Sequence, residues 1–124
     1  MRVRRVAYRV GSPGIPIRGP NGASAHVRHL ANALCEDHDT RVFASTLTDA
    51  RGAFGLPVPT IAAGAPAWPK WLDRYRDMIE VSAARRVANR VISSARHGWM
   101  PDVVIERHTL FSDAGWRVAD AINC

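Results

Sequence analysis

Lysine, cysteine and long apolar runs are scarce in this sequence of 124 residues. Lys70 is the only lysine, so the net charge of +6 rests almost wholly on arginine. Cys35 and Cys124 make neither a disulfide framework nor a metal-ligand pattern, and we expect Cys35, late in a helix, to be buried or half-buried. No segment approaches the roughly 20 apolar residues of a membrane span. The basic N-terminal segment does not make a signal peptide, so we expect a cytoplasmic protein.

The common nucleotide-binding signatures are also missing. No Gly-Lys-Ser or Gly-Lys-Thr occurs, which excludes a Walker A loop. The glycine-rich stretch near the N-terminus is not G-x-G-x-x-G, and the second expected strand ends without the Asp or Glu that would bind a ribose hydroxyl. No paired carboxylates follow the strands to suggest a magnesium site. These absences argue against a nicotinamide enzyme and against a bound metal.

The arginines do not form a nucleic-acid signature. They are scattered over several segments, no recognised nucleic-acid motif is present, and no aromatic platform is interleaved with them. The guanidinium group nevertheless suits bidentate binding of phosphate and carboxylate. The charge therefore disfavours nucleic acid as the partner but leaves acidic ligands and an anionic membrane surface open.

Length and composition fit one globular domain. A chain of 124 residues is near the commonest domain size, and contents of 47% hydrophobic and 23% charged residues are ordinary for a globular protein. The last expected helix stops at Cys124 with no glycine cap and no following strand. We expect a single domain over residues 1–124 that is truncated at its C-terminal end.

Strand and helix patterns alternate along the chain. The first strand is an almost continuous apolar run that suits a central strand buried on both faces, interrupted by Arg9. The alternation predicts an α/β fold, a Rossmann-like open, mostly parallel sheet with helices on both faces. The expected strands are residues 3–10, 41–45, 58–62 and 103–105. The expected helices are residues 24–36, about 66–98, as one long or two consecutive helices, and about 110 onward.

Connection rules predict the strand order. A right-handed crossover through the first helix places the first two strands side by side. The strand at residues 103–105 should then lie on the other side of the first, which creates a switch point of the kind where open α/β sheets bind ligands. The loop at residues 11–26 and the sequence Glu106-Arg107-His108 both follow strands at this edge.

The glycine-rich loop at residues 11–26 leads from a strand into a helix. Amide N–H groups in the first helical turn lack partners and carry partial positive charge, and glycines let the backbone approach a ligand closely. We expect Ser24 to be the N-cap and His26 to lie in the first turn, where the dipole favours a neutral imidazole. The loop predicts a phosphate-bearing ligand, although it could simply be a turn.

Aromatic residues cluster at the head of the long expected helix. We expect Trp68, Trp71 and Tyr75 to pack in the core or against a loop. The alternative is a hydrophobic patch for a lipid or a partner, which leaves a peripheral membrane contact open. Behind them, an apolar stripe with a spacing of four residues continues from Ile79 to Ala95.

Two motifs together resemble a known family. They are GxxGxSxHVRxLxxAL over residues 19–34 and PDVVIERHxLFSxxG over residues 101–115. In this order, and with a short strand between them, they resemble the N-terminal, acceptor-side domain of GT-B glycosyltransferases of the retaining family 4 type. The resemblance covers essentially the whole chain, and the incomplete N-terminal half of a GT-B fold is the architecture that it implies.

In that family, two Rossmann-like domains face each other across a cleft, and the C-terminal domain holds most of the nucleotide-sugar donor. The resemblance implies that the donor diphosphate is approached by Gly19, Asn21, Gly22 and Ala23. It implies no cofactor and no metal, because amides and basic side chains would meet the diphosphate charge.

The acceptor side of the cleft has four candidates. Arg107 could bind an acceptor hydroxyl, a phosphate or its neighbour Glu106, and the alternative is a structural Glu-Arg pair. His26 is a candidate for the cleft, or else an ordinary surface histidine. His108, where many relatives have Tyr, is the tentative catalytic base, although the departing phosphate could take the proton in a retaining transfer.

Two functions remain open. The first is the acceptor-side domain of a glycosyltransferase that transfers a sugar from a nucleotide-sugar to an unknown acceptor. Without its missing C-terminal domain or a partner chain, it would have no turnover, because closure across a cleft needs both walls. The second is a non-catalytic nucleotide- or phosphate-binding module that works with a separate partner chain.

Overall fold

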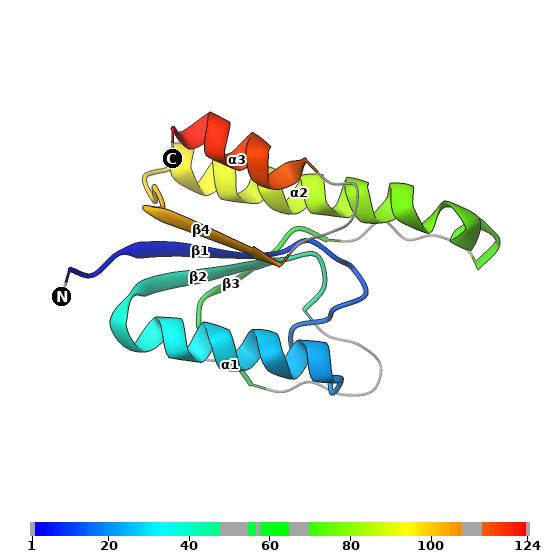
Figure 1. Ribbon diagram of the computed structural model, residues 1–124, viewed down its shortest axis with the longest axis horizontal. Helices are drawn as coiled ribbons and strands as arrows, with labels where there is room; N and C mark the ends of the chain where they lie inside the picture. The colour runs from blue at the N-terminus through cyan, green and yellow to red at the C-terminus, as the bar shows by residue number, and fades with distance from the viewer. Residues whose placement is uncertain (1, 48–54, 57, 65–69, 108–112, 124) are drawn as a thin grey trace.

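A four-stranded parallel sheet forms the centre of the fold in the computed structural model, which describes residues 2–47, 55–56, 58–64, 70–107 and 113–123. All three strand pairs are parallel, and the strand order is β3-β2-β1-β4 (Figure 1). This arrangement confirms the expected α/β, Rossmann-like open sheet. The strands are β1 (Arg5–Val10), β2 (Asp39–Ala44), β3 (Thr60–Ala62) and β4 (Val103–Arg107).

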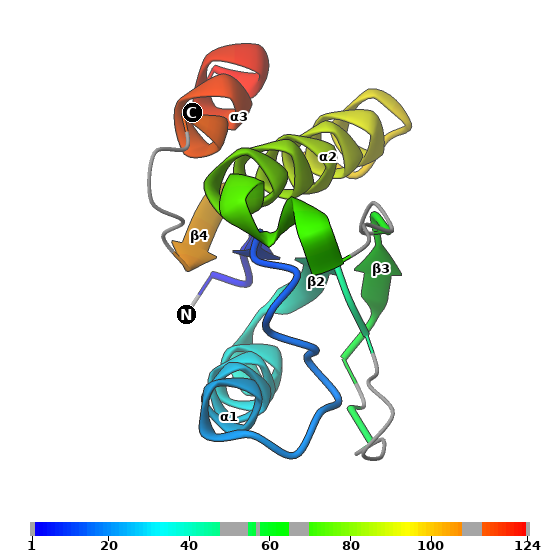
Figure 2. The ribbon, with the colours of Figure 1, turned by 90° about the vertical axis from the view of Figure 1, so that its right-hand side faces the viewer.

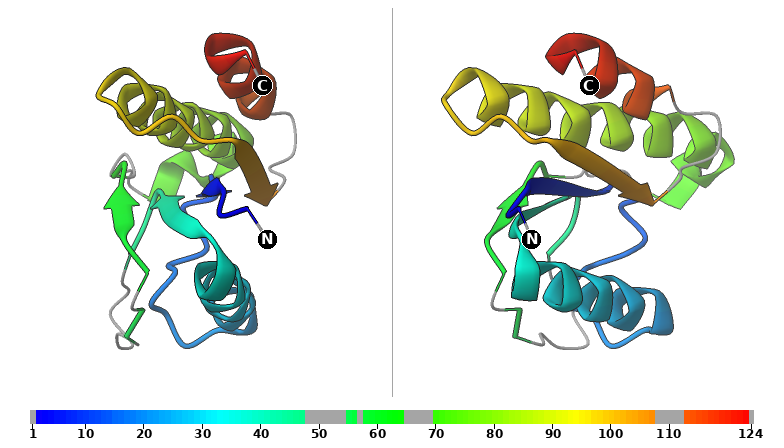
Figure 3. Two further views of the ribbon diagram at one scale, coloured as in Figure 1. Left: turned by 90° about the vertical axis from the view of Figure 1, so that its left-hand side faces the viewer. Right: turned by 60° about the vertical axis from the view of Figure 1, so that its left-hand side comes forward.

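Among the described residues, three α-helices cover the two faces of this sheet. Helix α1 (Gly22–Asp37) lies on one face, whereas α2 (Arg76–Arg96) and α3 (Ala114–Ile122) lie on the other (Figure 2, Figure 3). The chain leaves β1 through α1 to reach β2 on one side, and α2 later returns it to β4 on the other side of β1. The expected switch point between β1 and β4 is therefore confirmed.

Alternating residues of the central strands contribute to two separate hydrophobic cores, one on each face of the sheet. Ala7 and Phe43 pack with the apolar residues of α2 and α3, whereas Tyr8 and Val42 pack with those of α1. Every residue of β1 from Val6 to Val10 is buried. The prediction of a central strand buried on both faces is confirmed, and the charged residue within it must lie in the interior.

Trp99 anchors the connection between α2 and β4. Its indole Nε1 donates a hydrogen bond to Asp39 at 3.0 Å, and its ring lies 6.1 Å from the ring of Phe43. Arg41 lies on β2, and its guanidinium is 4.5 Å from the centroid of the Trp99 ring. The buried indole thus links the segment before β4 to the start of β2. This contact lies at the amino-terminal ends of the strands, opposite the carboxyl edge where a ligand is expected.

The first helix begins earlier than expected. Asn21, not Ser24, is the N-cap, and its side-chain oxygen accepts hydrogen bonds from the amide and the hydroxyl of Ser24, each at 2.8 Å. The carboxamide satisfies an amide that would otherwise lack a partner in the first turn. Because the helix starts at Gly22, His26 lies in the second turn, where it is exposed.

Removing this cap is expected to weaken the fold. Asn21→Ala should lower the free energy of unfolding by about 1 kcal/mol, because the Ser24 amide loses its acceptor. Urea unfolding followed by circular dichroism measures the change. Asn32→Ala, an exposed site in the same helix, is the matched control and should not lower stability. Equal stability of Asn21→Ala and the natural protein would contradict the capping role.

The head of the second long helix differs from expectation. A 3-10 turn at Lys70–Tyr75 precedes α2, and Trp71 and Tyr75 are 73% and 45% exposed, so the prediction that they are core aromatics is wrong. Figure 1 shows that this end of the helix projects beyond the strands of the sheet, so the sheet does not extend beneath the 3-10 turn. Trp68 lies outside the described residues. The predicted end at 97–98 is confirmed, with Gly98 at φ +98°.

One smaller expectation is corrected: Cys35 is exposed, because the last turn of α1 extends past its buried residues. Asn123 adopts the left-handed conformation, φ 55°, that a glycine cap would have supplied. No helix in the described ranges is long and apolar enough to cross a membrane.

Candidate functional site

The loop between β1 and α1, residues 11–21, is fixed to the chain that follows β2. The amides of Ile17 and Arg18 donate to backbone carbonyls of that segment at 3.2 and 2.7 Å. In return, the hydroxyls of Ser45 and Thr46 donate to carbonyls within the loop at 2.8 and 3.2 Å. The long connection is therefore a defined structure at the carboxyl edge of the sheet, and it determines where α1 begins.

The amides at this helix start fall into two groups. Those of Gly19 and Ser24 are used internally, by the carbonyl of Pro16 at 2.8 Å and by the Asn21 cap. Those of Gly22 and Ala23 occupy the first two helical positions, and no described residue accepts a hydrogen bond from them. Two donors therefore remain at the positive end of α1, which is where a helix binds an anion.

Gly22, the first residue of α1, has open space beside it. A Cβ built there would meet nothing within 4 Å, so packing does not demand a glycine. The residue is exposed, whereas Gly19 is buried. Of the four residues expected at a diphosphate, Gly22 and Ala23 thus present donors outward, while Gly19 and Asn21 build the loop and the cap.

Arg28 joins the helix to the loop. Its Nη1 donates to the carbonyl oxygens of Ile17 and Gly19 at 3.1 and 2.6 Å. The side chain of a helical residue leans toward the helix N-terminus, which is why a residue two turns into α1 reaches back this far. Sequence reasoning included Arg28 in a motif but gave it no role, because its partners are backbone atoms that only the folded loop brings near.

An ion pair between Arg9 and Glu106 lies near the same carboxyl edge, on the face of the sheet that α2 and α3 cover. Arg9 is 1% exposed, and its Nη1 donates to the Glu106 carboxylate on the neighbouring strand. Burial lowers the pKa of the Arg9 guanidinium and Glu106 opposes this shift. The parallel register sets Arg9 directly beside Glu106. Glu106 therefore pairs with Arg9, a partner that differs from the Arg107 of the expected structural alternative.

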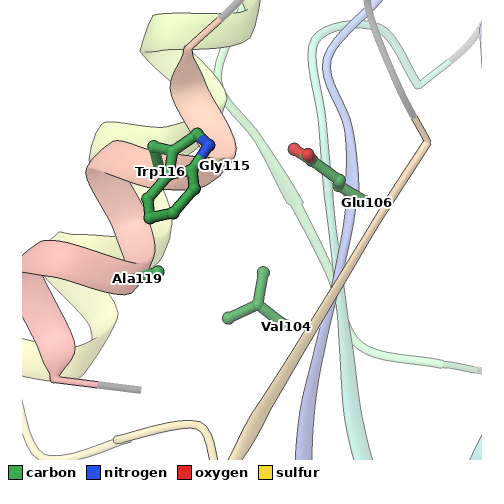
Figure 4. Close-up of a pocket in the computed structure, with 5 residues that line it drawn as sticks. All are labelled: Val104, Glu106, Gly115, Trp116 and Ala119. Carbon is green, nitrogen blue, oxygen red and sulfur yellow. The ribbon is translucent and has the colours of Figure 1, made fainter.

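The Glu106 carboxylate also reaches the start of α3. A Cβ built on Gly115 would lie within 3.0 Å of the carboxyl group of Glu106, so this carboxyl group would have to shift to admit a larger residue. Figure 4 shows Glu106 and Val104 of β4 facing Gly115, Trp116 and Ala119 of α3. These residues line an open cavity of about 460 Å³. The Glu106 side chain is 38% exposed and thus meets both the buried arginine and this open space.

The other acceptor-side candidates are not gathered at one point. Arg107 follows Glu106 and points to the opposite face of the sheet, toward α1. There burial raises the pKa of the Tyr8 hydroxyl, and the positive charge of Arg107 acts in the opposite sense. Within the described ranges, no hydrogen bond or ion pair joins His26 to Glu106 or Arg107. His108 lies outside the described residues.

The edge is bounded on the α2 side by a small cavity. About 120 Å³ is enclosed by Pro13, Gly14, Arg76 and Glu80, so the loop after β1 meets the first turns of α2. Arg18 in the same loop is half-buried, and its Nε has no hydrogen-bond partner in the part of the chain that the structure describes. No group of three or more His, Cys, Asp or Glu among the described residues could hold a metal ion.

Comparisons with protein-family models, with curated proteins and with solved structures find no match to this chain. Fold and geometry therefore define its class: an open parallel α/β domain with a fixed loop and two outward amide donors at its switch point.

Proposed function

We propose that this chain is the acceptor-side N-terminal domain of a retaining GT-B glycosyltransferase of the family 4 type. The observation that supports it is the pair of amides at Gly22 and Ala23, which lie at the start of α1, in the connection that leaves β1 at the switch point of the sheet. Ligands of open α/β sheets bind at this point. A cytoplasmic location is part of the same proposal.

In this function, the two amides donate to the diphosphate of a nucleotide-sugar. Arg18 and Arg28 add positive charge from the loop and from α1, so protein groups alone would neutralise the phosphate oxygens. Glu106, Arg107, His26 and His108 remain candidates for the acceptor side. We propose that turnover needs a second domain or a partner chain, since these residues form one wall of the cleft.

The binding test removes one amide without disturbing the helix. Gly22→Pro deletes the first helical N–H, at the position where proline is most favoured. Asn21 already has the extended backbone, φ −75° and ψ 164°, that a residue before proline needs. We expect the amides of Gly22 and Ala23 in the natural protein to shift on titration with UDP, GDP or pyrophosphate in NMR spectra, and Gly22→Pro to bind each more weakly.

Gly22→Ala is the matched control for this substitution. It keeps the N–H and adds a Cβ into open space, so it should bind as the natural protein does. Uridine, which has no phosphate, should give no shift. Unaltered pyrophosphate binding by Gly22→Pro would refute the amide site.

A second function, a non-catalytic phosphate-binding module, is favoured by the same two amides, because they recognise phosphate whatever it is attached to. Donor competition separates the two. The glycosyltransferase proposal predicts that one nucleotide-sugar binds more tightly than pyrophosphate, while the isolated chain gives neither transfer nor hydrolysis of it. Equal binding of all phosphates would support the second function, and robust turnover by the isolated chain would sink the claim that it needs a second wall.

A further inference from the structure

We propose that Arg28 is a positioning residue for the phosphate site, an inference that rests on the proposed function. The two hydrogen bonds from its Nη1 hold the carbonyls of Ile17 and Gly19 against α1, at 3.1 and 2.6 Å. These two carbonyls belong to the residues on either side of Arg18, and Gly19 lies two residues before the cap at Asn21. Arg28 therefore acts on the segment that leads into the ligand-facing amides.

The contact has an electrostatic consequence for an anion. Carbonyl oxygens carry partial negative charge, and any that faced the start of α1 would repel a phosphate at Gly22 and Ala23. Arg28 binds two carbonyls of the loop, those of Ile17 and Gly19, through its charged guanidinium. The carbonyls of Ile17 and Gly19 are thus bound by Arg28 and do not compete with an anion for the amides of Gly22 and Ala23.

The contact also has a mechanical consequence. The loop is otherwise fixed on its far side, where the amides of Ile17 and Arg18 donate to the segment after β2. Arg28 fixes it on the near side, to the helix itself. With both sides held, the position of Asn21 relative to α1 is set before a ligand arrives, which lowers the ordering cost of binding.

The test uses inorganic pyrophosphate and three variants of the full chain. Arg28→Met keeps the length of the side chain but removes its donors, and Arg28→Lys keeps one donor group and the charge. Arg90→Met is the matched control, because it removes one exposed charge from α2 on the opposite face of the sheet. NMR titration gives the affinity, amide hydrogen exchange reports on residues 15–24, and urea unfolding reports on overall stability.

We expect Arg28→Met to weaken pyrophosphate binding about tenfold and to speed exchange at the amides of Ile17, Arg18 and Gly19. Arg28→Lys should recover part of the affinity, and Arg90→Met should change neither quantity. Unchanged affinity in Arg28→Met overturns the inference. So does weaker binding with unchanged loop exchange, since that result makes Arg28 a direct ligand. If the natural protein itself does not bind pyrophosphate, the result contradicts the proposed function and not only the role of Arg28.

Discussion

Replacing Glu106 by alanine is expected to lower the free energy of unfolding by about 3 kcal/mol. The reason is the fate of Arg9, whose side chain is almost completely buried on the central strand and whose Nη1 bonds to the Glu106 carboxylate. Arginine stays charged in proteins, so the substitution would leave an unpaired positive charge in the core. The value lies at the lower end for buried pairs because the carboxylate itself is partly exposed.

The double substitution shows whether the charge is the cause. Arg9→Met alone should cost less, about 1 kcal/mol, because a half-exposed carboxylate can turn to water. Arg9→Met combined with Glu106→Ala should be more stable than Glu106→Ala alone. Glu36→Ala, which removes an exposed carboxylate from α1, is the control and should change little. Urea unfolding measures all four, and a Glu106→Ala protein as stable as the control would contradict the buried-charge argument.

This pair marks the limit of what the sequence could predict. The placing of β2 and β4 on opposite sides of β1 followed from sequence patterns and crossover handedness, because these rules hold for almost every parallel sheet. Arg9 stood in that same reasoning as an interruption of an apolar run. Its partner lies 97 residues further along the chain, and only the parallel register of β1 and β4 brings the two together. A charged residue inside a strand buried on both faces was the available signal for such a partner.

The helix start was uncertain for a different reason. Asn21 and Ser24 are both good N-caps by type, and the choice depends on where the loop delivers the chain. Hydrogen bonds to the segment after β2 and to Arg28 settle it. Burial of Trp71 was mispredicted for a related reason, since an apolar side chain is covered only where the sheet extends beneath it.

The sequence thus predicted where the candidate site would lie, but not the role of each residue in it. A glycine-rich connection from strand to helix at a switch point indicated an anion site near Gly22, and two outward amides are present there. The roles within the loop were not predictable, because they depend on which amides and carbonyls the folded loop uses itself. Gly19 looked like a ligand residue by type, yet its amide and its carbonyl both bond within the protein.

Gly115→Ala is expected to lower the free energy of unfolding by about 2 kcal/mol. The new Cβ would lie within 3.0 Å of the Glu106 carboxyl group, which must then swing toward the open cavity and weaken its bond to Arg9. The cost is smaller than that of Glu106→Ala because the displaced carboxylate still offsets part of the arginine charge. Gly22→Ala, also in a first helical turn but with open space at its Cβ, is the matched control and should not destabilise.

A double-mutant cycle identifies where the cost of Gly115→Ala arises. In the Glu106→Ala background no carboxylate stands in the way, so Gly115→Ala should cost nothing and could gain about 0.5 kcal/mol, because alanine is the better helix former. The coupling between the two sites would then equal most of the single-substitution loss. The same cost in both backgrounds would instead place the clash in the packing of α3 on α2. Coupling would show that one glutamate links the core arginine of β1 to the position of α3, so that any movement of α3 must change the environment of Arg9.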